Sequence, residues 1–195
     1  MKGILNTQSK KDIRNFFRQK LFSLTEEQIK RRSENVTKNF LALPIYNNAK
    51  VIMGYYPLKG EVDVLGILKK AIFSKKIVCF PVIDLKQKKL LPYCVEKIDD
   101  NFVCGPFGIK QPDIQKSKKI NIEQIDIVIV PALAFDYQKN RLGRGAGFYD
   151  RFLSNIKPPT KKIGICFDFQ LLESLPQDTR YDQKVDIILT ENFII

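Results

Sequence analysis

The sequence contains no histidine and no tryptophan. The absence of histidine excludes Ser-His-Asp and Cys-His catalysis, the histidine-based zinc motifs and any imidazole general base. Any chemistry in this chain therefore depends on carboxylates, cationic side chains, backbone amides or a metal held by oxygen atoms.

Cysteines and long apolar runs are also scarce. The four cysteines are Cys79, Cys94, Cys104 and Cys166; they include no C-x-x-C pair, and three lie in or beside apolar runs, so we expect reduced structural thiols. The longest apolar stretches fall short of the ~20 residues that a membrane helix needs. Residues 1–6 lack the apolar run of a secretory signal. These features predict a cytoplasmic protein with no membrane partner.

The size and composition fit one globular domain. The chain has 195 residues, of which 44% are hydrophobic and 28% are charged, so it is too apolar for a disordered protein. A chain of this length buries enough surface to stabilise one core. We predict a single domain over residues 1–195.

The net charge of +12 is unevenly distributed. Lysine and arginine are in excess in residues 1–40 and 69–97, whereas residues 121–195 are close to neutral. A basic surface favours anionic partners, either nucleic acid or a polyanionic small substrate. Solitary lysines on solvent-facing positions explain the same charge without any partner.

The hydrophobic pattern predicts alternating helices and strands. Helical spacing and a capping box at Thr25 and Gln28 indicate two N-terminal helices, over residues 9–22 and 26–42. The strands are expected at residues 51–56, 77–81, 90–95, 126–130, 162–166 and 186–190, with a helix at 64–73 and a long polar excursion at 96–124. The predicted fold is a three-layer αβα structure of the α/β class, with a mostly parallel central sheet and an N-terminal helical pair.

A glycine-rich segment, residues 141–151, follows the strand that ends at Pro131 and is expected to open a helix. Glycines at alternate positions leave the backbone free of Cβ atoms, so successive N–H groups can turn toward an anion, and a helix N-terminus adds positive charge. Arg141 and Arg144 are cations of the kind that bind phosphate oxygens, and Asp150 suits Mg²⁺. The segment therefore predicts a phosphate site.

Standard nucleotide motifs do not match this segment. The Lys-Ser/Thr pair of a P-loop is missing, and Phe148 stands where the dinucleotide fingerprint requires its third glycine. A tight turn without a ligand is the alternative interpretation of the glycines.

The run from Asp126 to Arg151, with its phrase Val-Pro-Ala-Leu-Ala-Phe-Asp at residues 130–136, closely resembles the 5-formyltetrahydrofolate cyclo-ligase (5,10-methenyltetrahydrofolate synthetase) family. The resemblance spans essentially the whole chain. It implies ATP- and Mg²⁺-dependent cyclisation of 5-formyltetrahydrofolate to 5,10-methenyltetrahydrofolate, with release of ADP and phosphate through a phosphorylated formyl (iminium phosphate) intermediate.

The resemblance also implies roles for individual residues. The ATP-binding residues are Lys10, Arg14, Arg141, Leu142, Gly143, Arg144, Gly145, Ala146, Gly147, Phe148 and Tyr149, of which Lys10 and Arg144 are catalytic. The substrate-binding residues are Arg14, Tyr56, Glu61, Phe107, Gly147 and Tyr149. The Mg²⁺ ligands are Asp150 and Asp186. Ala146, Gln111 and Tyr181 depart from the residues common in the family, which are Lys or Gly, Glu, and His or Asn.

Several of these residues also have simpler interpretations. Lys10 and Arg14 are four residues apart on a helix, where a solvated basic face is the usual explanation. Glu61 could be an acidic residue at a helix N-terminus, where the helix dipole favours negative charge. The aromatic residues could be ordinary core side chains. Asp186 could be a solvated turn residue.

The expected partners are 5-formyltetrahydrofolate, with or without a polyglutamate tail, and ATP as co-substrate; Mg²⁺ is the expected cofactor. We expect a monomer that binds no nucleic acid. A basic RNA-binding module is one alternative, although no RNP-like aromatic motif is present. A ligand-binding or transferase protein of similar α/β architecture is another, because a fold does not determine a function.

Overall fold

The computed structural model describes residues 9–98, 100–178 and 180–195. The prediction about a secretory signal at residues 1–6 lies outside these ranges. Among the described residues, none of the helices has both the length and the apolar character needed to span a bilayer.

A seven-stranded sheet forms the centre of the fold, with the strand order β12-β10-β7-β1-β2-β3-β6. The strands are β1 (Val51–Met53), β2 (Ile77–Asp84), β3 (Lys89–Val95), β6 (Lys118–Lys119), β7 (Ile127–Pro131), β10 (Lys161–Ile165) and β12 (Ile187–Leu189). The first five strands in this order pair in parallel, and β3 and β6 add antiparallel pairs at one edge. The predicted mostly parallel sheet is confirmed.

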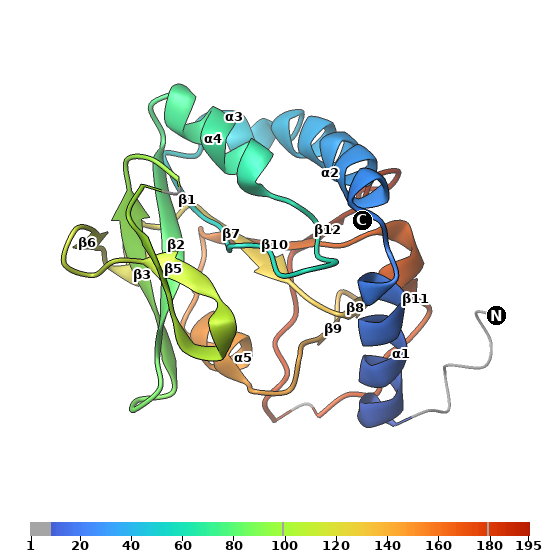
Figure 1. The fold of residues 1–195 in the computed structure, drawn as a ribbon. Coiled ribbons are helices and arrows are strands. Elements are labelled where there is room, and N and C mark those ends of the chain that lie inside the picture. The colour runs from blue at the N-terminus through green and yellow to red at the C-terminus, as the bar shows by residue number, and fades with distance from the viewer. Residues whose placement is uncertain (1–8, 99, 179) are drawn as a thin grey trace.

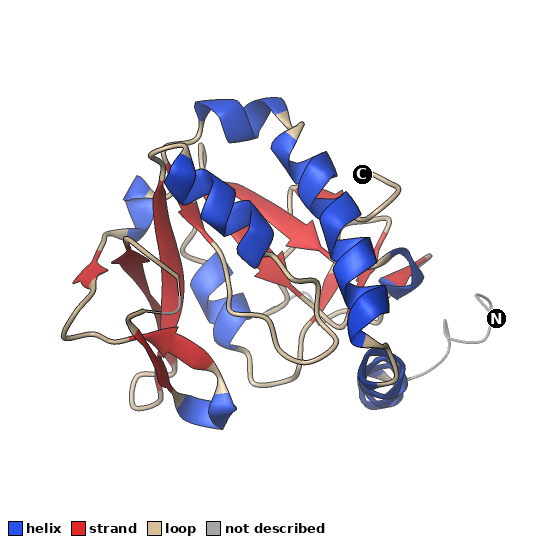
Figure 2. Cartoon of the chain, turned by 45° about the horizontal axis from the view of Figure 1, so that its top comes forward, coloured by secondary structure: helices blue, strands red, loops and turns tan. Residues whose placement is uncertain are grey.

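Helices cover both faces of the sheet (Figures 1 and 2). The helices α1 (Lys10–Phe22), α2 (Glu26–Leu41), α3 (Pro44–Asn48) and α4 (Leu65–Phe73) pack into one hydrophobic core, and α5 (Phe148–Leu153) packs into the other. The predicted three-layer arrangement and the two N-terminal helices are therefore present.

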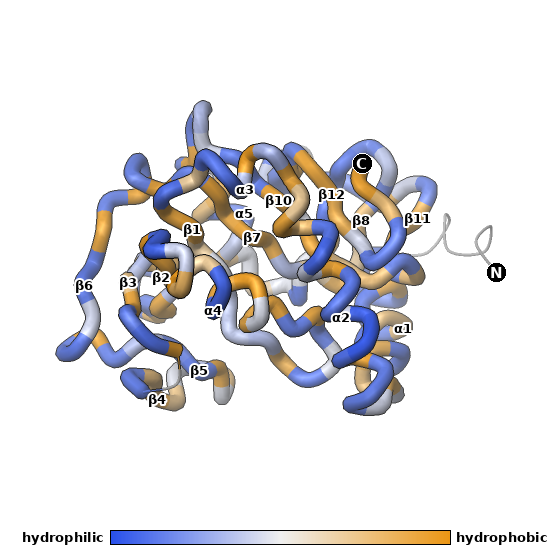
Figure 3. Tube along the Cα trace, turned by 90° about the horizontal axis from the view of Figure 1, so that it is seen from above, coloured by the Kyte–Doolittle hydropathy of each residue, from blue (hydrophilic) through white to orange (hydrophobic). Residues whose placement is uncertain are grey.

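Alternation along the strands explains why both faces are covered. In β7, Ile127 and Ile129 face the core of α1–α4, whereas Val128 and Val130 face the core of α5, and all four are fully buried. A strand that buries both faces gives a continuous apolar run instead of a polar alternation. Figure 3 shows this hydrophobic centre in orange, with the more hydrophilic α2 outside it.

The capping box that begins α2 is confirmed. The Thr25 hydroxyl accepts the backbone N–H of Gln28 at 3.2 Å, and the Gln28 side chain accepts the N–H of Thr25 at 3.0 Å. These two bonds satisfy N–H groups that the first helical turn would otherwise leave unpaired.

Short elements account for most differences from the predicted structure. The strand expected at residues 51–56 ends at Met53, and Tyr55 and Tyr56 continue as a loop before Pro57, which has no N–H to donate. The excursion at 96–124 holds β6 and a separate pair, β4 (Phe102–Cys104) and β5 (Lys110–Pro112). A three-stranded sheet of β8 (Ala134–Asp136), β9 (Arg141–Leu142) and β11 (Leu171–Leu172) was not predicted, because strands of two or three residues show no clear period.

The carboxylate of Asp136 holds this small sheet together. The side chain is fully buried and accepts the backbone N–H of Asn140 at 2.9 Å, the Asn140 side-chain amide at 2.8 Å and the backbone N–H of Leu175 at 2.9 Å. These bonds fix the turn that leads into β9 and therefore position the glycine-rich segment that follows.

Candidate active site

A cavity of about 780 Å³ opens where β1 and β7 end. Its walls include Tyr55 and Tyr56 after β1, Pro131 and Ala132 at the end of β7, and the whole of residues 141–150. This volume is in the range typical of small-molecule sites, and the carboxyl end of a parallel sheet is where α/β proteins bind ligands. Every residue that the sequence analysis assigned to the site lines the cavity except Asp186.

The glycine loop, residues 143–147, requires glycine at two positions. Gly145 has φ of 109° and Gly147 has φ of 70°, a region that other residues rarely adopt. A Cβ atom on Gly147 would also lie 2.6 Å from the guanidinium of Arg151. The helix that follows, α5, has only six residues, so the loop amides and the arginines, not a long helix dipole, make this wall attractive to anions.

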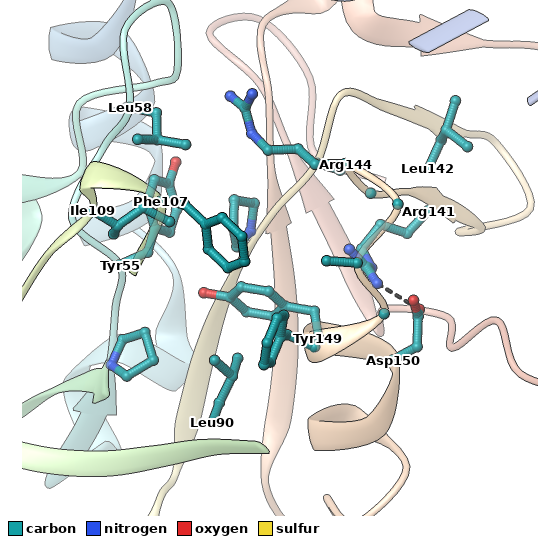
Figure 4. Close-up of a pocket in the computed structure, with 18 of the residues that line it drawn as sticks. Tyr55, Leu58, Leu90, Phe107, Ile109, Arg141, Leu142, Arg144, Tyr149 and Asp150 are labelled. Atoms are coloured by element: carbon teal, nitrogen blue, oxygen red, sulfur yellow. Dashed lines mark hydrogen bonds and ion pairs between the residues drawn. The ribbon is translucent and has the colours of Figure 1, made fainter. Parts of the chain in front are cut away.

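Arg141 and Asp150 form an ion pair on one wall of the cavity (Figure 4). The Arg141 side chain is only 3% exposed, and its guanidinium lies 5.7 Å from the ring centroid of Tyr149. Its Nε has no hydrogen-bond partner among the described residues. A buried guanidinium with an unused donor beside a cavity is suited to an anionic ligand.

Arg144 reaches across to Glu61, which precedes it by 83 residues. Its Nη2 and Nε atoms lie 2.7 and 3.0 Å from Oε1 of Glu61. The other Glu61 oxygen accepts the backbone N–H of Leu58 at 2.9 Å, so the carboxylate is fixed in place while its cationic partner stays partly exposed.

Helix α1 holds the glycine loop from the opposite side. The Nε of Arg14 donates to the carbonyl of Gly143 at 3.0 Å, and Nη2 of Arg18 donates to the carbonyl of Arg144 at 2.9 Å. Lys10 pairs with Asp182. Lys10 and Arg14 were predicted from the sequence as site residues, whereas Arg18 was not, although its spacing of four residues from Arg14 continues the same helix face.

Aromatic side chains form the other walls. Tyr149 points its hydroxyl into the cavity (Figure 4), and that buried hydroxyl has no hydrogen-bond partner among the described residues. Burial raises the pKa of Tyr149, so it stays protonated at neutral pH. Phe107 is 68% exposed at the cavity mouth, and the Tyr56 hydroxyl accepts from Lys110 Nζ at 3.1 Å. Tyr55, which the sequence analysis did not assign, donates to the carbonyl of Val62 at 3.0 Å.

Two of the three departures from the family pattern face the cavity. Ala146 and Tyr181 line it, whereas Gln111 is buried behind it. The Gln111 side-chain oxygen accepts the backbone N–H of Ile83 at 3.1 Å and so ties β5 to β2. A neutral amide fits this structural position.

Asp186 is not placed with Asp150. It precedes β12, lies outside the cavity lining, and its carboxylate accepts the backbone N–H of Lys162 at 2.7 Å. Within residues 9–98, 100–178 and 180–195, the acidic and cysteine side chains form no cluster of three that could hold a metal ion. Asp150 does line the cavity, and Mg²⁺ at nucleotide sites is usually bound by one or two carboxylates, with phosphate oxygens and water as the other ligands.

These features define an α/β protein with a ligand cavity at the carboxyl end of a parallel sheet, walled by arginines, a glycine loop and aromatic rings. The chain belongs to the 5-formyltetrahydrofolate cyclo-ligase family, whose family model matches residues 6–191. It is therefore an enzyme of the cyclo-ligase class.

Individual relatives agree with this assignment. The chain is 30% identical to the 5-formyltetrahydrofolate cyclo-ligase of Haemophilus influenzae, over 89% of this chain and 94% of the relative. It is similar to the 5,10-methenyltetrahydrofolate synthetase of Aquifex aeolicus, with a TM-score of 0.82, 33% identity and coverage of 95% and 91% of the two chains. The Mycoplasma pneumoniae synthetase structure, at 22% identity and a TM-score of 0.76, shares the fold over 94% of this chain and 99% of its own.

Proposed function

We propose that the chain converts 5-formyltetrahydrofolate to 5,10-methenyltetrahydrofolate with hydrolysis of ATP to ADP and phosphate. The observation that carries this proposal is that a loop rich in glycine and arginine faces a cavity whose other walls are aromatic. The first wall suits phosphates and the second suits a flat pterin ring.

The proposed chemistry proceeds in two bond exchanges. The formyl oxygen attacks the γ-phosphorus of ATP, ADP leaves, and the formyl carbon becomes part of an iminium phosphate. The neighbouring amine nitrogen of the folate then attacks that carbon, the ring closes and inorganic phosphate departs with the former formyl oxygen. Phosphoryl transfer of this kind depends on positioning and charge neutralisation more than on a protein base, which is consistent with a chain that has no histidine.

Four cationic side chains would bind the triphosphate. Lys10 and Arg14 come from α1, and Arg141 and Arg144 flank the glycine loop, whose backbone N–H groups add further donors. Lys10 and Arg144 pair with carboxylates in the structure, so we propose that they are already oriented before ATP arrives. We assign them the catalytic role of neutralising the charge that moves to the leaving ADP.

Asp150 would hold Mg²⁺ on the same wall. Bound Mg²⁺ supplies charge neutralisation for the phosphate oxygens. The neighbouring guanidinium of Arg141 orients the carboxylate. Asp186 as a second ligand stays a prediction, because the structure places its carboxylate on a backbone amide instead.

The folate would lie against the aromatic walls. Tyr56, Phe107 and Tyr149 would contact the pterin, Glu61 would accept hydrogen bonds from its amines, and Arg14 would bind a carboxylate of the glutamate tail. The basic surface provides for a polyglutamate tail as well. We propose that the enzyme acts as a cytoplasmic monomer.

The test is a spectrophotometric assay of the purified chain with 5-formyltetrahydrofolate, ATP and Mg²⁺, in which the conjugated methenyl product and ADP are followed together. We expect product only in the complete mixture, with ADP and product formed in equal amounts. ATP binding without folate turnover would favour the transferase or ligand-binding alternative. RNA binding with a steep salt dependence and no turnover would favour the RNA-binding alternative.

Replacing Arg14 by alanine is expected to raise KM for ATP or for the folate about tenfold, because a charged hydrogen bond to a ligand is worth about 1.5 kcal/mol or more. Steady-state kinetics with each substrate varied in turn provide the measurement. Arg31→Ala, an exposed cation on α2, is the control and should change neither KM. Unchanged KM values in Arg14→Ala would favour the alternative interpretation, in which Arg14 belongs to a solvated basic helix face.

Replacing Tyr149 by phenylalanine is expected to raise KM for the folate about tenfold without lowering the melting temperature, because its hydroxyl has no partner in the described protein and is free to bond the substrate. Kinetics and thermal denaturation together measure the two effects. Tyr55→Phe is the matched control, since it removes a bond to Val62 and should lower the melting temperature instead. A Tyr149→Phe variant with normal KM would exclude the hydroxyl from substrate binding.

A further inference from the structure

Two cysteines face each other across β2 and β3. Cys79 and Cys94 are direct register partners, and their Sγ atoms lie 2.8 Å apart. Both are free thiols; Cys79 is fully buried, and Cys94 is partly exposed. Neither belongs to the proposed phosphate or folate walls, so the proposed reaction leaves this pair without a role.

The backbone places the pair in a non-hydrogen-bonded position of the ladder. The carbonyl of Cys79 accepts the N–H of Gly54, which follows β1, and the carbonyl of Pro92 accepts the N–H of Ile120, which follows β6 on the other side. Since alternate residues of a strand bond toward the same side, Cys94 also turns its backbone away from β2. Opposite Cα atoms in such a position are about 4.5 Å apart, at the short end of the range that a disulfide can bridge.

The two thiols differ in reactivity. The hydrogen bond from Cys79 and the charge of Lys118 on β6 lower the pKa of Cys94, whereas the same hydrogen bond and burial raise the pKa of Cys79. The thiolate is the reactive form of cysteine, and the accessible thiolate reacts first. Cys94 is therefore the attacking residue of the pair and Cys79 the residue that closes the bond.

We propose that Cys79 and Cys94 are a redox pair that a hydroperoxide oxidises reversibly to a disulfide. The Cys94 sulfur attacks the terminal peroxide oxygen, the O–O bond breaks, and the alcohol or water leaves with one proton. The resulting sulfenic acid is attacked by the Cys79 sulfur, and its oxygen departs as water with the remaining proton. The two sulfurs together lose two electrons, and the peroxide gains them.

The position of the bond connects it to the cavity. Pro81 and Ile83 follow Cys79 on the same face of β2, and Leu90 lies on that face of β3; all three line the cavity. A disulfide here would join the two strands directly beside the residues that line the cavity. The pair therefore gives the cavity wall an oxidised and a reduced state.

The experiment oxidises the reduced full-length chain with hydrogen peroxide and maps its peptides without reduction. We expect a cross-linked peptide that joins Cys79 to Cys94 within one chain and that dithiothreitol removes. Cys104→Ser, which removes the exposed thiol of β4, should form the same cross-link. Neither the cross-linked peptide nor its loss on reduction depends on folate turnover, so failure of the proposed function would leave this result unaffected.

Two variants in the Cys104→Ser background separate the attacking role of Cys94 from the bond-closing role of Cys79. In the Cys94→Ser variant, hydrogen peroxide should consume free thiol at least about tenfold more slowly than in the Cys104→Ser parent. The remaining Cys79 thiol of the pair is protonated and inaccessible to solvent. Cys79→Ser should stop at a sulfenic acid on Cys94 that dimedone captures. The proposal would be overturned if both thiols of the wild-type protein survived the oxidation, or if only disulfides between chains formed. This test uses the wild-type protein, so it does not depend on whether the variants fold.

Discussion

Asp150→Asn is expected to lower kcat about 100-fold or more while the protein remains folded, which is the magnitude seen when one preorganised electrostatic contact to a transition state is lost. Asparagine has nearly the same shape as aspartate but no charge, so it would weaken both the proposed Mg²⁺ site and the pairing with Arg141. The concentration of Mg²⁺ needed for half-maximal activity should rise in parallel. Turnover measured across a Mg²⁺ titration records both effects.

The matched control for Asp150→Asn is Asp113→Asn. It removes a carboxylate outside the cavity that pairs with Lys116 at 3.9 Å and accepts the backbone N–H of Gln115 at 3.0 Å. It should retain normal kcat and Mg²⁺ dependence. An Asp150→Asn enzyme that works normally at limiting Mg²⁺ would remove Asp150 from the metal site and leave it as the partner of Arg141.

Asp136→Ala is expected to reduce the free energy of unfolding by about 3–5 kcal/mol, because three N–H donors lose their shared acceptor, the buried side chain of Asp136. At about 2–4 °C per kcal/mol for a chain of this size, the melting temperature should fall by roughly 6–20 °C. Chemical denaturation and thermal scanning would measure the two quantities.

Asp100→Ala provides the surface comparison. Asp100 pairs with Lys97 at 3.9 Å, and both side chains are more than half exposed, so its removal should cost well under about 1 kcal/mol. Equal stability of Asp136→Ala and Asp100→Ala would contradict this prediction. The hydrogen bonds of Asp136 would then not be needed to hold β8, the turn at Asn140 and the segment at Leu175 together.

The fold could be predicted from sequence wherever hydrophobic periods were long. The continuous apolar run of β7 and the capped helix α2 each carry their own local signal, and the structure confirms both. The sheet of β8, β9 and β11 could not be predicted, because its two- and three-residue strands are stabilised by tertiary bonds such as the one from the Leu175 N–H to Asp136, 39 residues away in sequence. Such bonds join residues that are distant in sequence and leave no periodic pattern.

The candidate site shows the same division. The glycine loop was found because glycines and arginines cluster within a few residues. The pairing of Arg144 with Glu61 spans 83 residues, and the bond from Arg18 to the loop spans 126, so neither could be inferred from local spacing. Asp186 follows a sequence motif, yet backbone bonding at the start of β12 engages its carboxylate outside the cavity. The position of Asp186 in a sequence motif therefore did not predict which group its carboxylate bonds.

The pairing of Lys10 with Asp182 joins positions 172 residues apart, which has a consequence for biosynthesis. The partner that completes this side of the cavity is therefore synthesised long after the first helix. A contact with such a large sequence separation carries a high loop-closure entropy, which slows its formation. A nascent chain in which Asp182 has not yet been synthesised therefore lacks this part of the cavity wall, although the glycine loop is already present in its sequence.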